Sequence, residues 1–83
     1  MLKVCFFARL RESLGTGVES VAVDGLTDVA ALMQRLQTKG GVWEQEFSAD
    51  NSLQVAINHQ VAQCDSGLKD GDEVAFFPPV TGG

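Results

Sequence analysis

The sequence of 83 residues is short of the side chains that build metal centres. Two cysteines, Cys5 and Cys64, and one histidine, His59, cannot supply the four ligands of a zinc or iron–sulfur site within the chain. We therefore expect this chain to bind no metal and no cofactor. Free cysteine is most often an inert small hydrophobic residue, and His59 follows Asn58 in a predicted turn, so none of the three is expected to carry chemistry.

Basic residues are also few. Lys and Arg number 6 against 11 Asp and Glu, which gives a formal net charge of −5. A basic face supplies most of the affinity of nucleic-acid-binding proteins, so we expect no nucleic-acid partner. The acidic balance permits a basic protein partner, for which charge mainly improves the encounter rate and the orientation.

Long apolar runs are absent. No stretch approaches the roughly 18 apolar residues that a transmembrane helix needs. The apolar run at the N-terminus is broken at Arg9 and is shorter than the apolar core of about 7–15 residues in a signal peptide. We therefore expect a cytoplasmic protein that has no membrane partner and whose thiols are reduced.

The composition is that of one small globular domain. Hydrophobic residues make up 45% of the chain and charged residues 20%, and no repeat or interdomain linker interrupts it. A chain of this size buries about 60–65% of its unfolded surface, which is enough for one modest core.

Alternation of apolar residues predicts strands over residues 2–8, 18–23, 53–58 and 73–77, with a short one over 61–63. Thr27 is the expected N-cap of a helix, and Asp28 suits the positive end of the helix dipole. Lys39 and the glycines after it end this helix. Its apolar stripe follows the i, i+3, i+4, i+7 spacing and consists of Val29, Leu32, Met33 and Leu36.

Residues 42–51 give the weakest pattern. Trp43 and Phe47 are expected to pack onto the body of the domain from a short helical turn. The helix must bury its stripe against one face of the sheet, so the pattern predicts a small α+β domain. The residues expected on that face are Leu2, Val4, Phe6, Val21, Val23, Leu53, Val55, Ile57, Val74 and Phe76.

The opposite face of the sheet receives the residues between these. If the first and last strands are neighbours, Phe7 and Phe77 lie close together on this face, beside Cys5 and Ala75. Two interpretations are open: a loop or the Trp43 segment covers the phenylalanines, or they form an apolar protein interface. We favour the interface, with Arg9 and Arg11 as polar anchors at its rim. Both arginines could also be ordinary solvated charges.

The last eight residues, from Phe76 to Gly83, read FFPPVTGG. Pro78 and Pro79 donate no N–H and therefore end the last strand. We expect residues 1–77 to form the domain and 78–83 a tail that reaches roughly 20 Å when extended. Glycine has no Cβ, so Gly82 and Gly83 can enter a slot too narrow for any side chain. Such a tail suits a terminal carboxylate that is itself the reactive group.

This ending resembles that of the small, sulfur carrier subunits of molybdopterin synthase, a family of ubiquitin-like proteins. The resemblance extends over nearly the whole chain except residues 42–52. The segments that carry it are KVCFFA at 3–8, Arg11-Glu12, AIN at 56–58, LKDGDEVA at 68–75 and the tail. It implies a β-grasp (ubiquitin-like) fold, with a mixed sheet of four or five strands and one main helix packed on one face.

The resemblance also implies a chemistry. A ubiquitin-activating-like adenylyltransferase would use ATP and magnesium to adenylate Gly83, and sulfur from a sulfurtransferase would then convert it to a thiocarboxylate. The tail would enter the large subunit of the synthase and give its sulfur to cyclic pyranopterin monophosphate. Gly82 would provide steric clearance, while Pro78, Pro79, Val80 and Thr81 set the reach of the tail. The chain would be a non-catalytic subunit of a heterotetramer, with Phe7, Arg9, Arg11, Ala75 and Phe77 at the interface.

Other functions stay open on the residues alone. A sulfur carrier for thiamin biosynthesis or for tRNA thiolation would use the same activation, although the thiamin carriers are expected to lack the two prolines. A protein modifier would join Gly83 to lysine, and in a plain binding domain the glycines would be incidental. Asp70, Asp72 and Glu73 are grouped as metal ligands can be, but we expect them to shape a turn and to present charge.

Overall fold

The structure is a computed structural model that describes residues 1–48 and 53–79. Five strands form one mixed sheet in the order β2-β1-β5-β3-β4. β1 and β5 are parallel neighbours at its centre, whereas the other pairs are antiparallel. The strands are β1 (Leu2–Phe6), β2 (Val18–Val21), β3 (Gln54–Ile57), β4 (Gln60–Ala62) and β5 (Glu73–Phe77). This is the β-grasp arrangement that the resemblance implies, and each predicted strand is confirmed to within two residues at each end.

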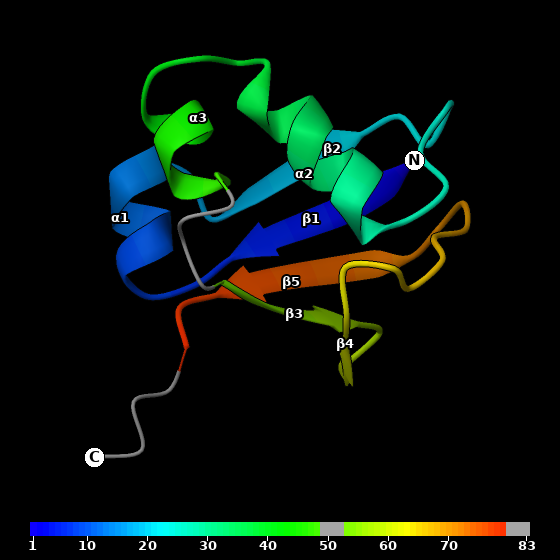
Figure 1. The fold of residues 1–83 in the computed structure, drawn as a ribbon. Coiled ribbons are helices and arrows are strands. Elements are labelled where there is room, and N and C mark those ends of the chain that lie inside the picture. The colour runs from blue at the N-terminus through cyan, green and yellow to red at the C-terminus, as the bar shows by residue number, and fades with distance from the viewer. Residues whose placement is uncertain (49–52, 80–83) are drawn as a thin grey trace.

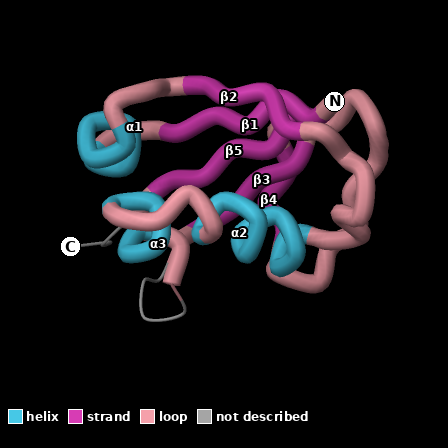
Figure 2. Tube along the Cα trace, turned by 90° about the horizontal axis from the view of Figure 1, so that it is seen from above, coloured by secondary structure: helices cyan, strands magenta, loops and turns pink. Residues whose placement is uncertain are grey.

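Within the described residues, helices cover only one face of this sheet (Figures 1 and 2). The longest, α2 (Val29–Gln37), lies across it, and α3 (Val42–Glu46) packs beside α2. The third, α1 (Arg9–Leu14), follows β1 directly and contacts α3 and β5. α1 was not predicted, because the sequence analysis assigned no helix between the first two strands. The expectation of one main helix is therefore approximate.

The core lies between the covered face and α2. Seven of the ten sheet residues expected there are buried, and Val23, Leu53 and Ile57 pack partly buried against them. Val29, Leu32 and Leu36 of the helical stripe are fully buried, and the fourth member, Met33, is partly buried. Leu10, Leu26 and Leu68 complete the core from segments outside the predicted pattern.

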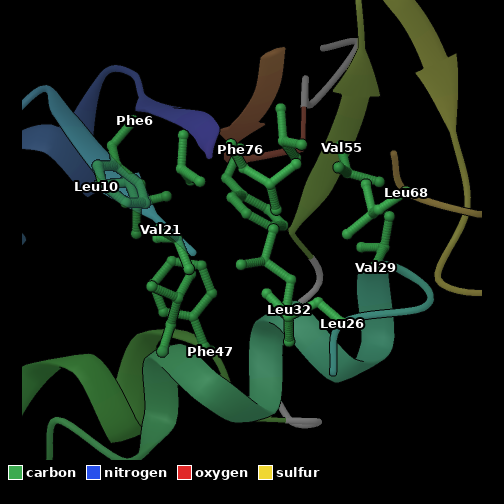
Figure 3. Packing of buried hydrophobic residues seen from close by; sticks show 14 residues of the cluster. Phe6, Leu10, Val21, Leu26, Val29, Leu32, Phe47, Val55, Leu68 and Phe76 are labelled. Atoms are coloured by element: carbon green, nitrogen blue, oxygen red, sulfur yellow. The ribbon is translucent and has the colours of Figure 1, made fainter. Parts of the chain in front are cut away.

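Phe47 joins α3 to the sheet (Figure 3). Its ring meets Phe6 at 5.9 Å and Phe76 at 5.1 Å, both edge-on. Trp43 meets Phe6 edge-on at 5.4 Å. Edge-to-face pairs of this kind contribute about 0.5–1.5 kcal/mol each beyond the area they bury. The predicted packing of Trp43 and Phe47 onto the body is confirmed.

Asp28, and not Thr27, is the N-cap of α2. Its side chain accepts a hydrogen bond of 2.9 Å from the Ala31 N–H. The N–H groups of Val29 and Ala30 donate to the carbonyls of Ser66 and Cys64. The segment before β5 therefore accepts hydrogen bonds from N–H groups that have no partner within the first turn of α2. These hydrogen bonds fix the position of α2 over the sheet.

Candidate docking face and carrier tail

Within the described residues, the face of the sheet that no helix covers carries an unbroken row of apolar residues. Strand register places one residue from each strand side by side in it: Val18, Cys5, Ala75, Ala56 and Val61. Directly paired residues point to the same face, and the strand neighbours of Cys5, Ala75 and Ala56 belong to the core or pack against it. We call this surface, together with Phe7 and Phe77, the docking face.

Exposure along the docking face is uneven. Val18 is 50% exposed and Val61 81%, although both are large hydrophobic residues. Cys5 is only 8% exposed at the centre. Apolar residues that reach from one edge of a sheet to the other, with no helix above them, are typical of a surface that a partner covers.

Phe7 and Phe77 stand at one end of the docking face. The Phe7 N–H donates to the Phe76 carbonyl at 3.2 Å, so the pairing of β1 with β5 continues one residue past the strand and brings Phe7 level with Phe77. Phe7 is 49% exposed, and Phe77 is partly buried. Trp43 does not cover them, because it packs against Phe6 on the opposite face. Of the two interpretations, this geometry favours the interface.

Pro78 and Pro79 continue the chain directly from this end of β5, and Pro79 is exposed. The chain therefore leaves the sheet at the end of β5, directly after Phe77 (Figure 1). The remaining tail residues, Val80, Thr81, Gly82 and Gly83, lie outside the described residues, and their expected roles stay predictions.

Arg9 and Arg11 belong to α1, which begins immediately after Phe7 and Ala8. Both side chains are exposed. Ala8 has φ 56° and ψ −135°, a backbone conformation that glycine adopts far more readily. This reversal turns the chain from β1 into α1. The expected role of Arg9 and Arg11 as polar anchors at the rim of the interface stays a prediction.

Asp70 and Asp72, two of the acidic residues grouped before β5, make structural contacts within the domain. The Asp72 carboxylate, in a residue 8% exposed, accepts hydrogen bonds from the Lys69 N–H at 2.9 Å and the Asn58 side-chain amide at 3.0 Å. Both hydrogen bonds hold the pKa of Asp72 below its ordinary value, and the bond from the Lys69 N–H has the larger effect. The pKa of Asp70 is lowered by its hydrogen bond with the N-terminal ammonium group of Met1 and by that group's charge.

Asn58 ties the β3–β4 hairpin to β5. Its side-chain oxygen accepts from the Glu73 N–H at 3.0 Å, while its own N–H donates to the Glu73 carbonyl at 2.8 Å. Asn58 and His59 both have positive φ, as a two-residue hairpin turn requires. The expectation that this region shapes a turn is confirmed. Within residues 1–48 and 53–79, no group of three or more His, Cys, Asp or Glu side chains could hold a metal ion.

Part of the docking face was not predicted from the sequence. Cys5, Ala75 and the two phenylalanines were expected there, but Val18, Ala56 and Val61 were not. The alternation that put Val55 and Ile57 into the core already put Ala56 on the other face, so the signal was present. The order and the register of the strands were also needed to see that the five residues form one row.

None of the helices in the described part of the chain has the length and apolar character needed to cross a membrane.

Comparisons with known proteins agree with this architecture. The family model described as the ThiS family matches residues 4–83. The molybdopterin synthase sulfur carrier subunit of Escherichia coli K12 is 47% identical over 83 residues, and the alignment covers 100% of both chains. The crystal structure of SAMP1 from Haloferax volcanii superposes with a TM-score of 0.79 at 31% identity, over 99% of this chain and 98% of that one.

A third match is a complex. The structure of subunits 1 and 2 of the molybdopterin-converting factor from Helicobacter pylori contains a chain that superposes with a TM-score of 0.66. The identity is 23%, over 99% of this chain and 97% of that one, so the likeness is one of fold.

Proposed function

Since the chain belongs to the ThiS family, we propose that it is the sulfur carrier subunit of a molybdopterin synthase. The observation that carries this proposal is the full-length similarity to the E. coli subunit of that name. The apolar docking face, which ends where the chain leaves the domain, supports it independently of sequence identity.

The proposed chemistry takes place at Gly83. A carboxylate is a poor electrophile, so a ubiquitin-activating-like partner, using ATP and magnesium, first joins it to AMP and releases the pyrophosphate of ATP. Sulfur from a sulfurtransferase then displaces AMP and leaves a thiocarboxylate. In the synthase this sulfur passes to cyclic pyranopterin monophosphate, and Gly83 returns to a carboxylate. The dithiolene of molybdopterin holds two sulfur atoms, so each product needs two loaded carriers.

The carrier contributes position, whereas the large subunit contributes catalysis. The docking face would lie against the large subunit and fix the origin of the tail. Pro78 and Pro79 preset the backbone there, which lowers the entropy lost when the tail is immobilised. Gly82 would let the tail enter a narrow channel. We place this work in the cytoplasm, as part of a heterotetramer of two carriers and two large subunits.

The test is the intact mass of the protein after incubation with ATP, magnesium, a cognate activating enzyme and a sulfur source. We expect the gain of one oxygen exchanged for one sulfur, located at Gly83 by fragmentation. The loaded protein, mixed with the large subunit and cyclic pyranopterin monophosphate, should yield molybdopterin. Loading without molybdopterin would indicate a carrier for thiamin or tRNA thiolation. No loading, with an enzyme that is active on a control carrier, would contradict the proposal.

A second candidate is a protein modifier. The similarity to SAMP1 favours it, because other solved structures of that protein are named small archaeal modifier protein 1. In that case Gly83 would form isopeptide bonds with lysine. Lysine-linked adducts that contain the C-terminal peptide of this chain, found in extracts of the native host, would support the modifier.

A further inference from the structure

We propose that the hollow between α1 and residues 15–17 binds an acidic side chain of the protein that covers the docking face. We further propose that Gly17 is the residue that positions Arg11 for it. This inference rests on the proposed function, since it concerns the same docking partner.

The hollow adjoins the docking face. Its lining includes Ala8, Arg9, Arg11, Thr16 and Gly17. Ala8 directly follows Phe7, so one wall of the hollow is continuous with the exposed phenylalanine.

Backbone hydrogen bonds fix both walls. The Gly17 carbonyl accepts from the Phe6 N–H at 3.0 Å, and the Gly15 N–H donates to the Arg11 carbonyl at 3.1 Å. Residues 15–17 are therefore tied both to the end of β1 and to α1, which holds the two walls in place relative to each other.

The hollow carries positive charge on an acidic protein. Arg9 and Arg11 face one carboxylate in its lining, that of Glu12, while the whole chain has a net charge of −5. No ion pair joins either arginine to another residue within the described part of the chain. By contrast, Lys39 is paired with Glu19, and Arg35 donates to the Asp24 carbonyl.

The residue type indicates the kind of group that would bind. A guanidinium offers a planar fork of N–H donors that matches the two oxygens of a carboxylate. Arg is also enriched at protein interfaces. We therefore assign the hollow to an Asp or Glu side chain of the docking protein.

Gly17 determines where the Arg11 side chain lies. A Cβ at position 17 would stand 3.0 Å from Arg11 Nε and 3.3 Å from both its Cδ and Cζ. Glycine is not required there by the backbone, because Gly17 has no left-handed φ. The absent side chain instead leaves room for Arg11 to lie flat against the loop. Because Arg11 is exposed, Ala at position 17 should displace it at little cost to folding.

Gly67 offers a matched control. It also lacks a left-handed φ, and a Cβ there would meet only the Thr27 carbonyl oxygen, at an ordinary contact distance of 3.8 Å. Gly67→Ala is therefore the same chemical change, on a similarly permissive backbone, with no arginine to displace.

The experiment measures the Kd for the purified large subunit of the same organism's molybdopterin synthase by calorimetry at two NaCl concentrations. The chains compared are wild type, Gly17→Ala, Gly67→Ala, Arg11→Ala and the double variant Gly17→Ala/Arg11→Ala. We expect Gly17→Ala to raise the Kd about three- to fivefold, as for the loss of one exposed ion pair. Gly67→Ala should leave it unchanged.

The double variant isolates the positioning role. In the Arg11→Ala background, Gly17→Ala should have no further effect on the Kd, since the residue through which it acts is absent. Gly17→Ala and Arg11→Ala should each also lose part of the salt dependence of the wild-type Kd. A structural role of Gly17 would instead weaken binding equally in both backgrounds and lower the Tm.

The outcomes separate the two proposals. Suppose that the wild-type chain binds the large subunit, and that Gly17→Ala either leaves the Kd unchanged or raises it equally in both backgrounds. This result would overturn the inference and leave the proposed function intact. A wild-type chain that fails to bind the large subunit would overturn both.

Discussion

Ala8 has a backbone conformation that L-residues rarely adopt, with φ 56° and ψ −135°. Gly41, which precedes α3 as Ala8 precedes α1, has nearly the same angles, φ 57° and ψ −129°. The same reversal is thus made once with glycine and once with alanine. Strain of this kind costs about 1–3 kcal/mol and is retained beside the docking face.

Ala8→Gly should therefore stabilise the domain. Relief of the strain outweighs the entropy that glycine adds to the unfolded chain, which is about 0.4–1 kcal/mol. We expect a net gain of about 1 kcal/mol, or a rise in Tm of about 4–8 °C for a domain of this size. Thermal unfolding by circular dichroism measures it. A lower Tm would show that Ala8 is not strained.

Asp72 should make the stability of the domain depend on pH. Its pKa is lowered in the folded protein by the hydrogen bonds from Lys69 and Asn58. A carboxyl group with a lowered folded pKa stabilises the fold above its unfolded pKa, about 3.9. That stability is lost as the pH falls through the folded pKa.

Urea unfolding at a series of pH values tests this effect. Asp72→Asn should be less stable than wild type at pH 7, and the gap in the free energy of unfolding should narrow as the pH falls through the lowered folded pKa and the wild-type carboxyl becomes neutral. Asp70→Asn is the control, because its exposed ion pair with the Met1 ammonium group contributes little. A gap between wild type and Asp72→Asn that stays constant with pH would contradict the assignment.

At the scale of elements, α2 depends on its cap. Asp28→Ala removes the hydrogen bond to the Ala31 N–H and should cost about 1 kcal/mol of stability. Thr27→Ala, one residue earlier, should cost less, because the cap is not its side chain. Chemical denaturation of both variants gives the comparison. An equal or larger loss for Thr27→Ala would restore the cap that the sequence pattern favoured.

Thr27 and Asp28 illustrate what could be predicted from the sequence and what could not. Both residue types make good caps, so local preference placed the helix but not its first residue. The deciding contacts come from the turn at Ser66, far along the chain. The strands were predictable because apolar residues alternate along a strand when one face of the sheet is buried. Helix α1 was missed because six residues with only Leu10 and Leu14 on the inner side give too short a pattern.

The candidate site divides in the same way. Phe7, Phe77 and Ala75 were predictable once β1 and β5 were taken as neighbours, since alternation alone then assigns their face. The apolar row from Val18 to Val61 depends on the register of four strand pairs. Gly17 could not be found from the sequence, because its role depends on where one arginine side chain lies in space.

At the scale of the whole molecule, the proposed function assigns docking and sulfur transfer to separate parts of the chain. The docking face belongs to the folded domain, whereas the proposed reacting group is Gly83, the last residue of the sequence. A chain that lacks only Gly83 should therefore fold normally, bind the large subunit and donate no sulfur. It should also inhibit molybdopterin formation by the loaded wild-type carrier, because both chains compete for one surface.

Phe7→Ala in the same shortened chain provides the control. Phe7 is 49% exposed, so its truncation should change the Tm little, but loss of this large aromatic contact, beside the origin of the tail, should weaken docking by about 2 kcal/mol, or roughly thirtyfold. The double variant should then inhibit only at correspondingly higher concentration. Molybdopterin yield as a function of added variant measures both effects. If the chain without Gly83 does not inhibit, the tail rather than the sheet supplies the affinity, and the docking face is not the surface that the synthase binds.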